Sequence, residues 1–194
     1  MKPVIFEGSA TALITPFKEG NLPDVELFGR IIDFQLKNKT DAVIVAGTTG
    51  EASTLTKKEH RQLCDAAVKK IKGKIPVIAG TGSNDTKKAL YLSQSAEDAG
   101  VDALLLVTPY YNKTTQKGLV EHYFYIADRT SLPIILYNVP SRTGLNILPE
   151  TYKRLSEHPN IVAAKEANGN IESIIKTMNL CGKDLTFYSG DDSL

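Results

Sequence analysis

The chain is poor in the residues that usually build metal sites and disulfides. Its 194 residues include two cysteines, Cys64 and Cys181, and three histidines, His60, His122 and His158, which lie far apart in the sequence. No ligand spacing links a histidine to a cysteine, so we expect no zinc site. Both cysteines fall in helix-like segments, which predicts free thiols in a cytoplasmic protein rather than a disulfide framework.

Long hydrophobic runs and an excess of one charge are also missing. No run reaches the roughly 18 apolar residues that predict a membrane span, and residues 1–17 lack the apolar segment and cleavage site of a signal peptide. The formal net charge is +1, and no basic run appears. We therefore expect neither a membrane nor a nucleic acid as a partner. The 42% of apolar residues is ordinary for a globular domain.

A repeated unit is present instead: a short apolar run, a turn rich in Gly, Thr and Asn, and an amphipathic stretch. The apolar runs cover residues 10–15, 41–47, 75–81, 102–108, 132–138, 160–166 and 184–190. Most of them are continuous rather than alternating, which predicts parallel strands covered on both faces. Apolar residues at helical spacing, with start signals such as the capping box at 56–59 and Pro149, predict six intervening helices.

Seven strands alternating with six helices fit two α/β architectures, a doubly wound open sheet and a (β/α)8 TIM barrel. No G-x-G-x-x-G follows the first strand, which weakens the dinucleotide-binding open sheet. A barrel usually has eight units and about 250 residues, whereas this sequence stops where a seventh helix should begin. We therefore expect 1–194 to be the N-terminal three-quarters of a single TIM-barrel domain, with the eighth strand and the C-terminal helices absent.

Lys165 stands at the end of the apolar run 161–164. Sites of both architectures form at the carboxyl ends of the strands. A lysine desolvated there has a lowered pKa, and its neutral amine can attack a carbonyl to form a Schiff base. The alternative is a lysine paired with Glu166 or reaching the surface.

Other strand ends carry matching chemistry. The turn 47–51 offers backbone N–H groups and the hydroxyls of Thr48 and Thr49 for a small anion. Tyr111 and Tyr137 can relay protons, and Arg142 can clamp a carboxylate. The alternatives are that the turn 47–51 is a plain glycine loop, that the two tyrosines only pack as aromatic residues, and that Arg142 is a surface charge. Together these groups suit an aldol reaction of a keto acid.

Five motifs carry a family resemblance: GTTGE at 47–51, PYYN at 109–112, YNVPSRTG at 137–144, AAKEANGN at 163–170 and SGDD at 189–192. In this order the chain resembles the dihydrodipicolinate synthase / N-acetylneuraminate lyase family of pyruvate-dependent class I aldolases on a TIM barrel. The resemblance implies a lyase that condenses pyruvate with L-aspartate-4-semialdehyde to 4-hydroxy-tetrahydrodipicolinate, in the diaminopimelate route to lysine. It implies no cofactor beyond the covalent pyruvate Schiff base, and a homotetramer built as a dimer of dimers.

The resemblance also implies roles for individual residues. Lys165 would form the Schiff base, and Tyr137 would be the central proton donor and acceptor. Thr48 and Thr49 would bind the pyruvate carboxylate, and Thr49 would also link two tyrosines. Tyr111 would complete the proton relay across a dimer interface. Arg142 would bind the carboxylate of the semialdehyde, and Gly190 would line the side of the site that receives this second substrate.

Two alternatives stay open, along with one departure from the family. A sibling pyruvate aldolase, such as N-acetylneuraminate lyase or a 2-keto-3-deoxy sugar-acid aldolase, shares the lysine and the tyrosine, although the SRTG arginine at 142 favours the synthase. An inactive truncated fragment is the second alternative. Relatives that are inhibited by lysine carry a histidine and an acidic residue where this chain has Lys57 and Lys88, so we expect weak or absent lysine feedback.

Overall fold

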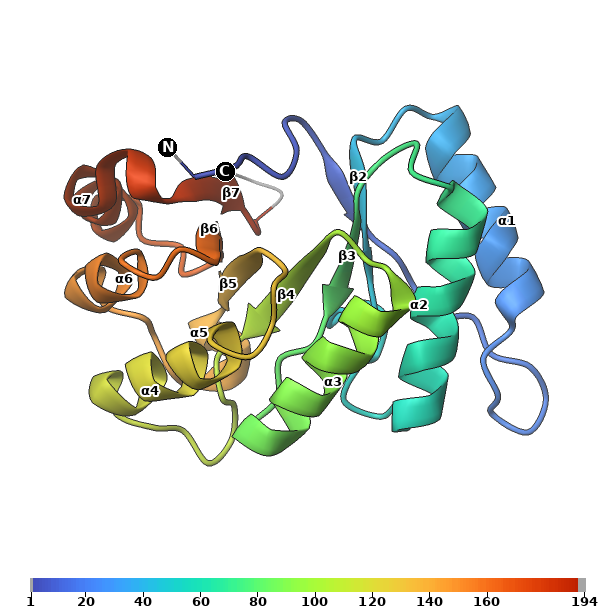
Figure 1. Ribbon diagram of the computed structural model, residues 1–194, viewed down its shortest axis with the longest axis horizontal. Coiled ribbons are helices and arrows are strands. Elements are labelled where there is room, and N and C mark those ends of the chain that lie inside the picture. Colours follow the sequence, from blue (N-terminus) through green and yellow to red (C-terminus); the bar gives the residue numbers. More distant parts are fainter. Residues whose placement is uncertain (1, 192–194) are drawn as a thin grey trace. The chain divides into compact units, whose positions relative to one another are not determined.

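The structure, a computed structural model, describes residues 2–191, which form two compact units. The first unit comprises residues 2–4, 82–90 and 106–191, and the second comprises residues 5–81 and 91–105. Strands alternate with helices along the chain in both units (Figure 1). None of the helices within residues 2–191 is long and apolar enough to cross a membrane.

Over the described residues, seven strands follow one another in one sheet in chain order. Five pairings, β1–β2, β2–β3, β3–β4, β5–β6 and β6–β7, are parallel. The strands are β1 (Ala10–Ala12), β2 (Ala42–Val45), β3 (Val77–Gly80), β4 (Ala103–Val107), β5 (Ile134–Asn138), β6 (Ile161–Glu166) and β7 (Thr186–Ser189). Each lies within a predicted apolar run, and the α/β class with the strand order of a (β/α)8 barrel is confirmed.

Burial follows the position of a strand in the sheet. Every residue of β2, β3 and β5 is buried, as continuous apolar runs predict for strands covered on both faces. β1 and β7, at the two ends of the order, are mostly half-buried. β1 is shorter than the predicted run 10–15. The last ladder bond runs from Leu13 N to Ile44 O, and beyond it the Thr15 hydroxyl donates to the carbonyl of Gly50 at 2.7 Å.

Six helices match the predicted ones, and their start signals act as expected. The Asp24 side chain accepts from Leu27 N at the start of α1, and Thr56 and Glu59 form the capping box of α2. The six are α1 (Val25–Lys37), α2 (Lys57–Ile71), α3 (Thr86–Ala99), α4 (Gln116–Ala127), α6 (Pro149–Leu155) and α7 (Ile171–Cys181). In the second unit α1 packs against α2, and in the first α6 packs against both α4 and α7 (Figure 1).

Two short helices were not predicted: α5 (Pro140–Thr143) and a 3₁₀ helix, η1 (Gly182–Asp184). Four residues are too few to show a helical period, so α5 escapes a search based on periodicity. Its only sequence signals are Pro140 in the first turn and Gly144, which ends the helix at a φ of 69°. α5 matters because it carries Arg142.

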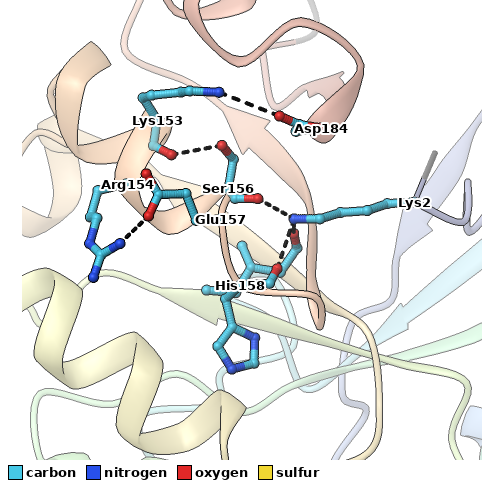
Figure 2. Close-up of polar contacts among 8 residues, drawn as sticks. Lys2, Lys153, Arg154, Ser156, Glu157, His158 and Asp184 are labelled. Atoms are coloured by element: carbon cyan, nitrogen blue, oxygen red, sulfur yellow. Dashed lines mark hydrogen bonds and ion pairs between the residues drawn. The ribbon is translucent and has the colours of Figure 1, made fainter.

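The N-terminal segment is tied to the turn between α6 and β6. The Lys2 ammonium donates to the carbonyl oxygens of Ser156, His158 and Ile161, the last two at 2.7 Å (Figure 2). Burial lowers the pKa of Lys2. Three bonds from one ammonium fix the turn from which the strand carrying Lys165 begins.

Candidate functional site

Lys165 and Tyr137 lie next to each other in the sheet of the first unit. They are register partners on β6 and β5, and the Lys165 Nζ lies 4.6 Å from the centre of the Tyr137 ring. Tyr137 is 7% exposed, and Lys165 is only partly buried among the buried residues of β6. An amine in contact with the face of an aromatic ring is held by a cation–π interaction when it is charged. The predicted nucleophile and proton donor are therefore brought together.

Gly190 borders the same lysine. A Cβ placed on Gly190 would lie 3.0 Å from Lys165 Cε and 3.1 Å from Lys165 Cγ, closer than side chains normally approach. The Gly190 amide also donates to the carbonyl of Glu166 at 2.7 Å. A side chain at position 190 would therefore force the Lys165 side chain out of its present conformation. Asp192, the last residue of the SGDD motif, lies outside the described residues.

Glu166, which immediately follows Lys165, is the residue that the sequence did not mark as part of a site. Successive side chains of a strand point to opposite faces, so Glu166 shares the far face of the sheet with its register partner Asn138. Its carboxylate accepts hydrogen bonds from Asn138 and Tyr152. The signal in the sequence was a carboxylate that follows Lys165 at the end of an apolar run, at a position that the alternation of faces buries.

Arg142 and Tyr111 are both exposed residues of the first unit, and Tyr111 lies in a loop. Arg142 is on α5, which begins two residues after β5, so it extends from the strand end that carries Tyr137. Tyr111 is 89% exposed at a φ of 69°, a conformation that few residues other than glycine adopt. A large aromatic side chain held outward by such a backbone is available for contact with another molecule.

Thr48 and Thr49 belong to the second unit, in the turn that leaves β2. Gly47 O accepts hydrogen bonds from Gly50 N at 3.1 Å and from Ala52 N at 3.2 Å, which closes the turn tightly. Both threonines are exposed at its tip. The predicted glycine-rich turn is thus present, and its role in holding an anion stays a prediction.

No three His, Cys, Asp or Glu side chains cluster as metal ligands anywhere in residues 2–191. Cys64 and Cys181 are both free and buried, as predicted. Burial raises the pKa of the Cys64 thiol to about 12, so this cysteine is no nucleophile. The candidate chemistry of the first unit centres on Lys165, which Tyr137 and Gly190 contact.

Comparison with known proteins identifies the family. The model of the dihydrodipicolinate synthetase family matches residues 5–194. The 4-hydroxy-tetrahydrodipicolinate synthase of Caldicellulosiruptor saccharolyticus is 58% identical over 188 residues, which are 97% of this chain. The chain spans 63% of the length of that curated relative.

Solved structures agree with the sequence match. The crystal structure of dihydrodipicolinate synthase from Aquifex aeolicus has a TM-score of 0.94 at 49% identity and covers 97% of this chain and 64% of its own. The chloride-inhibited dihydrodipicolinate synthase from Acinetobacter baumannii, solved in complex with pyruvate, has a TM-score of 0.94 at 42% identity, over 97% of this chain and 65% of its own. With a family model matched over nearly its whole length, the chain belongs to the dihydrodipicolinate synthetase family.

Proposed function

We propose that the protein condenses pyruvate with L-aspartate-4-semialdehyde through a Schiff base on Lys165, giving 4-hydroxy-tetrahydrodipicolinate in the diaminopimelate route to lysine. The observation that carries the proposal is the Lys165 amine at the carboxyl end of β6, 4.6 Å from the Tyr137 ring. An amine beside a phenol supplies the two groups that a class I aldolase needs first, a nucleophile and a proton donor. Relatives named for this reaction support it.

The chemistry begins when the neutral Lys165 amine attacks the ketone carbon of pyruvate. Tyr137 delivers a proton to the departing oxygen, and water leaves as the iminium forms. The iminium then withdraws electrons from the methyl carbon, which loses a proton to give an enamine. This sequence needs no metal and no organic cofactor, because the protonated imine is itself the electron acceptor.

Carbon–carbon bond formation follows. The enamine carbon attacks the aldehyde carbon of the second substrate, and the aldehyde oxygen takes up a proton. The amino group of that substrate then adds to the iminium carbon, closes the ring and expels the Lys165 amine. Lysine is regenerated, and one water has been released per turnover.

Four further residues have proposed roles in binding and proton relay. Thr48 and Thr49 would hold the pyruvate carboxylate, Thr49 would link two tyrosines, and Arg142 would bind the carboxylate of the semialdehyde through its planar fork. Tyr111 would complete the relay in the site of a neighbouring subunit, within a homotetramer built as a dimer of dimers. Its outward position, 89% exposed, supports that arrangement.

Regulation and location are part of the proposal. Lys57 lies with its Nζ 3.9 Å from the centre of the Tyr91 ring, so this position presents a cation. A ligand ammonium would be repelled there, and we expect inhibition by L-lysine to be weak or absent. The two free thiols support a cytoplasmic location.

Reductive trapping tests the proposal. The purified protein is incubated with pyruvate and borohydride, and its mass is measured before and after digestion. We expect one reduced pyruvate adduct, located at Lys165 and absent in K165A. K176A is the control, because Lys176 is an exposed lysine paired with Glu150 at 2.7 Å. An unmodified protein would refute the Schiff base.

The second substrate is tested separately. Condensation with L-aspartate-4-semialdehyde is compared with condensation with N-acetylmannosamine and glyceraldehyde. Turnover with the semialdehyde is the expected result, whereas turnover with a sugar aldehyde alone would assign the protein to the sibling aldolases.

A further inference from the structure

The side chain of Glu166 is buried behind the sheet position that carries Lys165. Glu166 is 5% exposed and is the register partner of Asn138, while the preceding pair in the same ladder is Lys165 and Tyr137. The two pairs therefore sit one residue apart on opposite faces of β5 and β6. Contacts that hold Asn138 opposite Glu166 therefore also hold Tyr137 opposite Lys165.

The Glu166 carboxylate receives hydrogen bonds from three directions. Its Oε1 accepts from Asn138 Nδ2 at 2.9 Å and from the amides of Ala167 and Asn168 at 3.0 Å each. Its Oε2 accepts from the Tyr152 hydroxyl at 2.7 Å and from Asn138 Nδ2 at 3.1 Å. One carboxylate thus joins β5, α6 and the loop that follows β6.

Asn138 carries the network onward to the segment after α5. Its Nδ2 donates to Asn146 Oδ1 at 2.7 Å, and its Oδ1 accepts from Ile147 N at 3.1 Å. Gln116 on α4 braces the same segment, since its Nε2 donates to the Asn146 carbonyl at 2.8 Å. The loop that leads away from Arg142 is therefore held by the same buried polar network as Glu166.

The β5–β6 ladder is irregular at its start, so the register at its carboxyl end depends on other contacts, such as this network. Ile134 pairs with Ile161, but the next residue, Ile135, pairs with Ala163, so the register shifts by one between them. Regular pairing from the start of the strands would therefore not place Tyr137 opposite Lys165. The bonds of Glu166 lie at the carboxyl end, where the shifted register must be kept.

We infer that Glu166 is a positioning residue, which holds the carboxyl ends of β5 and β6 in the register that places the Tyr137 ring against the Lys165 amine. That this register matters for catalysis rests on the proposed function. The Asn138, Ala167 and Asn168 N–H groups can only donate, and the Tyr152 hydroxyl also donates here, so an acceptor on both oxygens satisfies all of them. E166Q keeps the size of the side chain but puts an amide donor among those donors.

The experiment measures the rate of borohydride trapping of pyruvate against pyruvate concentration. In E166Q we expect the maximal rate to fall about tenfold or more, because small displacements of reacting groups are costly. The half-saturating pyruvate concentration should change less than about twofold, because the Glu166 side chain lies on the opposite face of the sheet from Lys165. E150Q is the matched control on an exposed carboxylate of α6, and its rate should equal that of the wild type.

A purely structural role would give a different result. Rates are compared at a temperature at which each variant is fully folded by circular dichroism, so an E166Q protein with the wild-type maximal rate would overturn the inference. If E166Q does not fold, Y152F decides, since it removes one of the donors to Glu166 and leaves Asn138 and the two amides in place. We expect its maximal rate to fall about threefold, and an unchanged rate would overturn the inference.

A second measurement separates this inference from the proposed function. In protein labelled with ¹³C at lysine Cε, the Tyr137 ring current should displace the Lys165 Cε proton signal, which is assigned by its loss in K165R. We expect E166Q to lose the displacement and E150Q to keep it, whether or not pyruvate is trapped. If the protein does not trap pyruvate but E166Q loses the displacement of the Lys165 signal, the Schiff base alone is refuted. If E166Q keeps that displacement, the positioning role of Glu166 is refuted.

Discussion

The Lys165 amine contacts the face of the Tyr137 ring, 4.6 Å from its centre, because the two residues are register partners on adjacent parallel strands. On the other side of Lys165, its register partner on β7 is a second tyrosine, Tyr188. The candidate nucleophile thus has a tyrosine as its neighbour on both adjoining strands. The resemblance to the family assigns chemistry to only one of them, and this difference can be tested.

We predict that Y137F slows reductive trapping by about 100-fold or more, because a positioned proton donor typically contributes that much. The ring remains beside Lys165, so pyruvate binding should change little. Y188F is the matched control, with the same change on the opposite strand, and should trap pyruvate at the wild-type rate. Equal losses in both variants would mean that the Tyr137 hydroxyl has no special role.

Gly190→Ala should displace Lys165 without altering any reacting group. The new Cβ would lie 3.0 Å from Lys165 Cε and 3.1 Å from Ala167 Cβ, so the flexible lysine side chain must move and the backbone at Ala167 must shift slightly. We expect the trapping rate to fall about tenfold or more. G29A is the control, because a Cβ on Gly29 meets only Lys70 Cε at 4.0 Å. A G190A protein that traps pyruvate normally would show that the contact with Gly190 does not set the position of Lys165.

Arg142→Lys should weaken binding of the second substrate only. Lysine keeps the charge but loses the two-pronged geometry that arginine offers a carboxylate, so we expect the KM for the semialdehyde to rise about tenfold. Trapping of pyruvate should be unchanged, since that step precedes the aldehyde. R154K is the control on α6, where Arg154 pairs with Glu157 at the surface. An unchanged KM in R142K would remove Arg142 from the site.

The free energy of unfolding should depend on pH through His122. This histidine is 6% exposed, its Nδ1 lies 2.8 Å from the Thr86 hydroxyl, and its Nε2 is buried without a hydrogen-bond partner among the described residues. Burial lowers the pKa of His122 to about 4, whereas the ordinary value is 6.5. Between these two values the unfolded chain binds a proton that the folded chain does not.

Stability should therefore fall as the pH is lowered from 6.5 towards 4, by about 1.4 kcal/mol per pH unit from this residue. H122Q cannot titrate and should lose that part of the slope. Urea unfolding of both proteins at pH 7 and pH 5 measures the difference. Parallel slopes for the wild type and H122Q would show that His122 is not held neutral by burial.

Local signals in the sequence predicted most of the fold. Continuous apolar runs marked all seven strands, because strands covered on both faces need no polar alternation. The capping box that begins at Thr56 marked a helix start, because the first N–H groups of a helix need acceptors nearby in the chain. Lys165 was found for a similar reason, since a charged residue at the end of a buried run is costly without a function. That residues 1–194 are part of one barrel domain stays a prediction.

The remaining features depend on contacts between segments far apart in the sequence. The pairing of Tyr137 with Lys165 follows from a register shift at Ile134–Ile135, which no local pattern encodes. The closeness of Gly190 to Lys165 and the burial of Glu166 likewise appear only when β5, β6 and β7 are aligned. The sequence by itself determined which residues are candidates for the chemistry and on which strand ends they stand. Which of them meet was decided by the tertiary structure, because strand register is set by side-chain packing and buried hydrogen bonds rather than by local backbone preference.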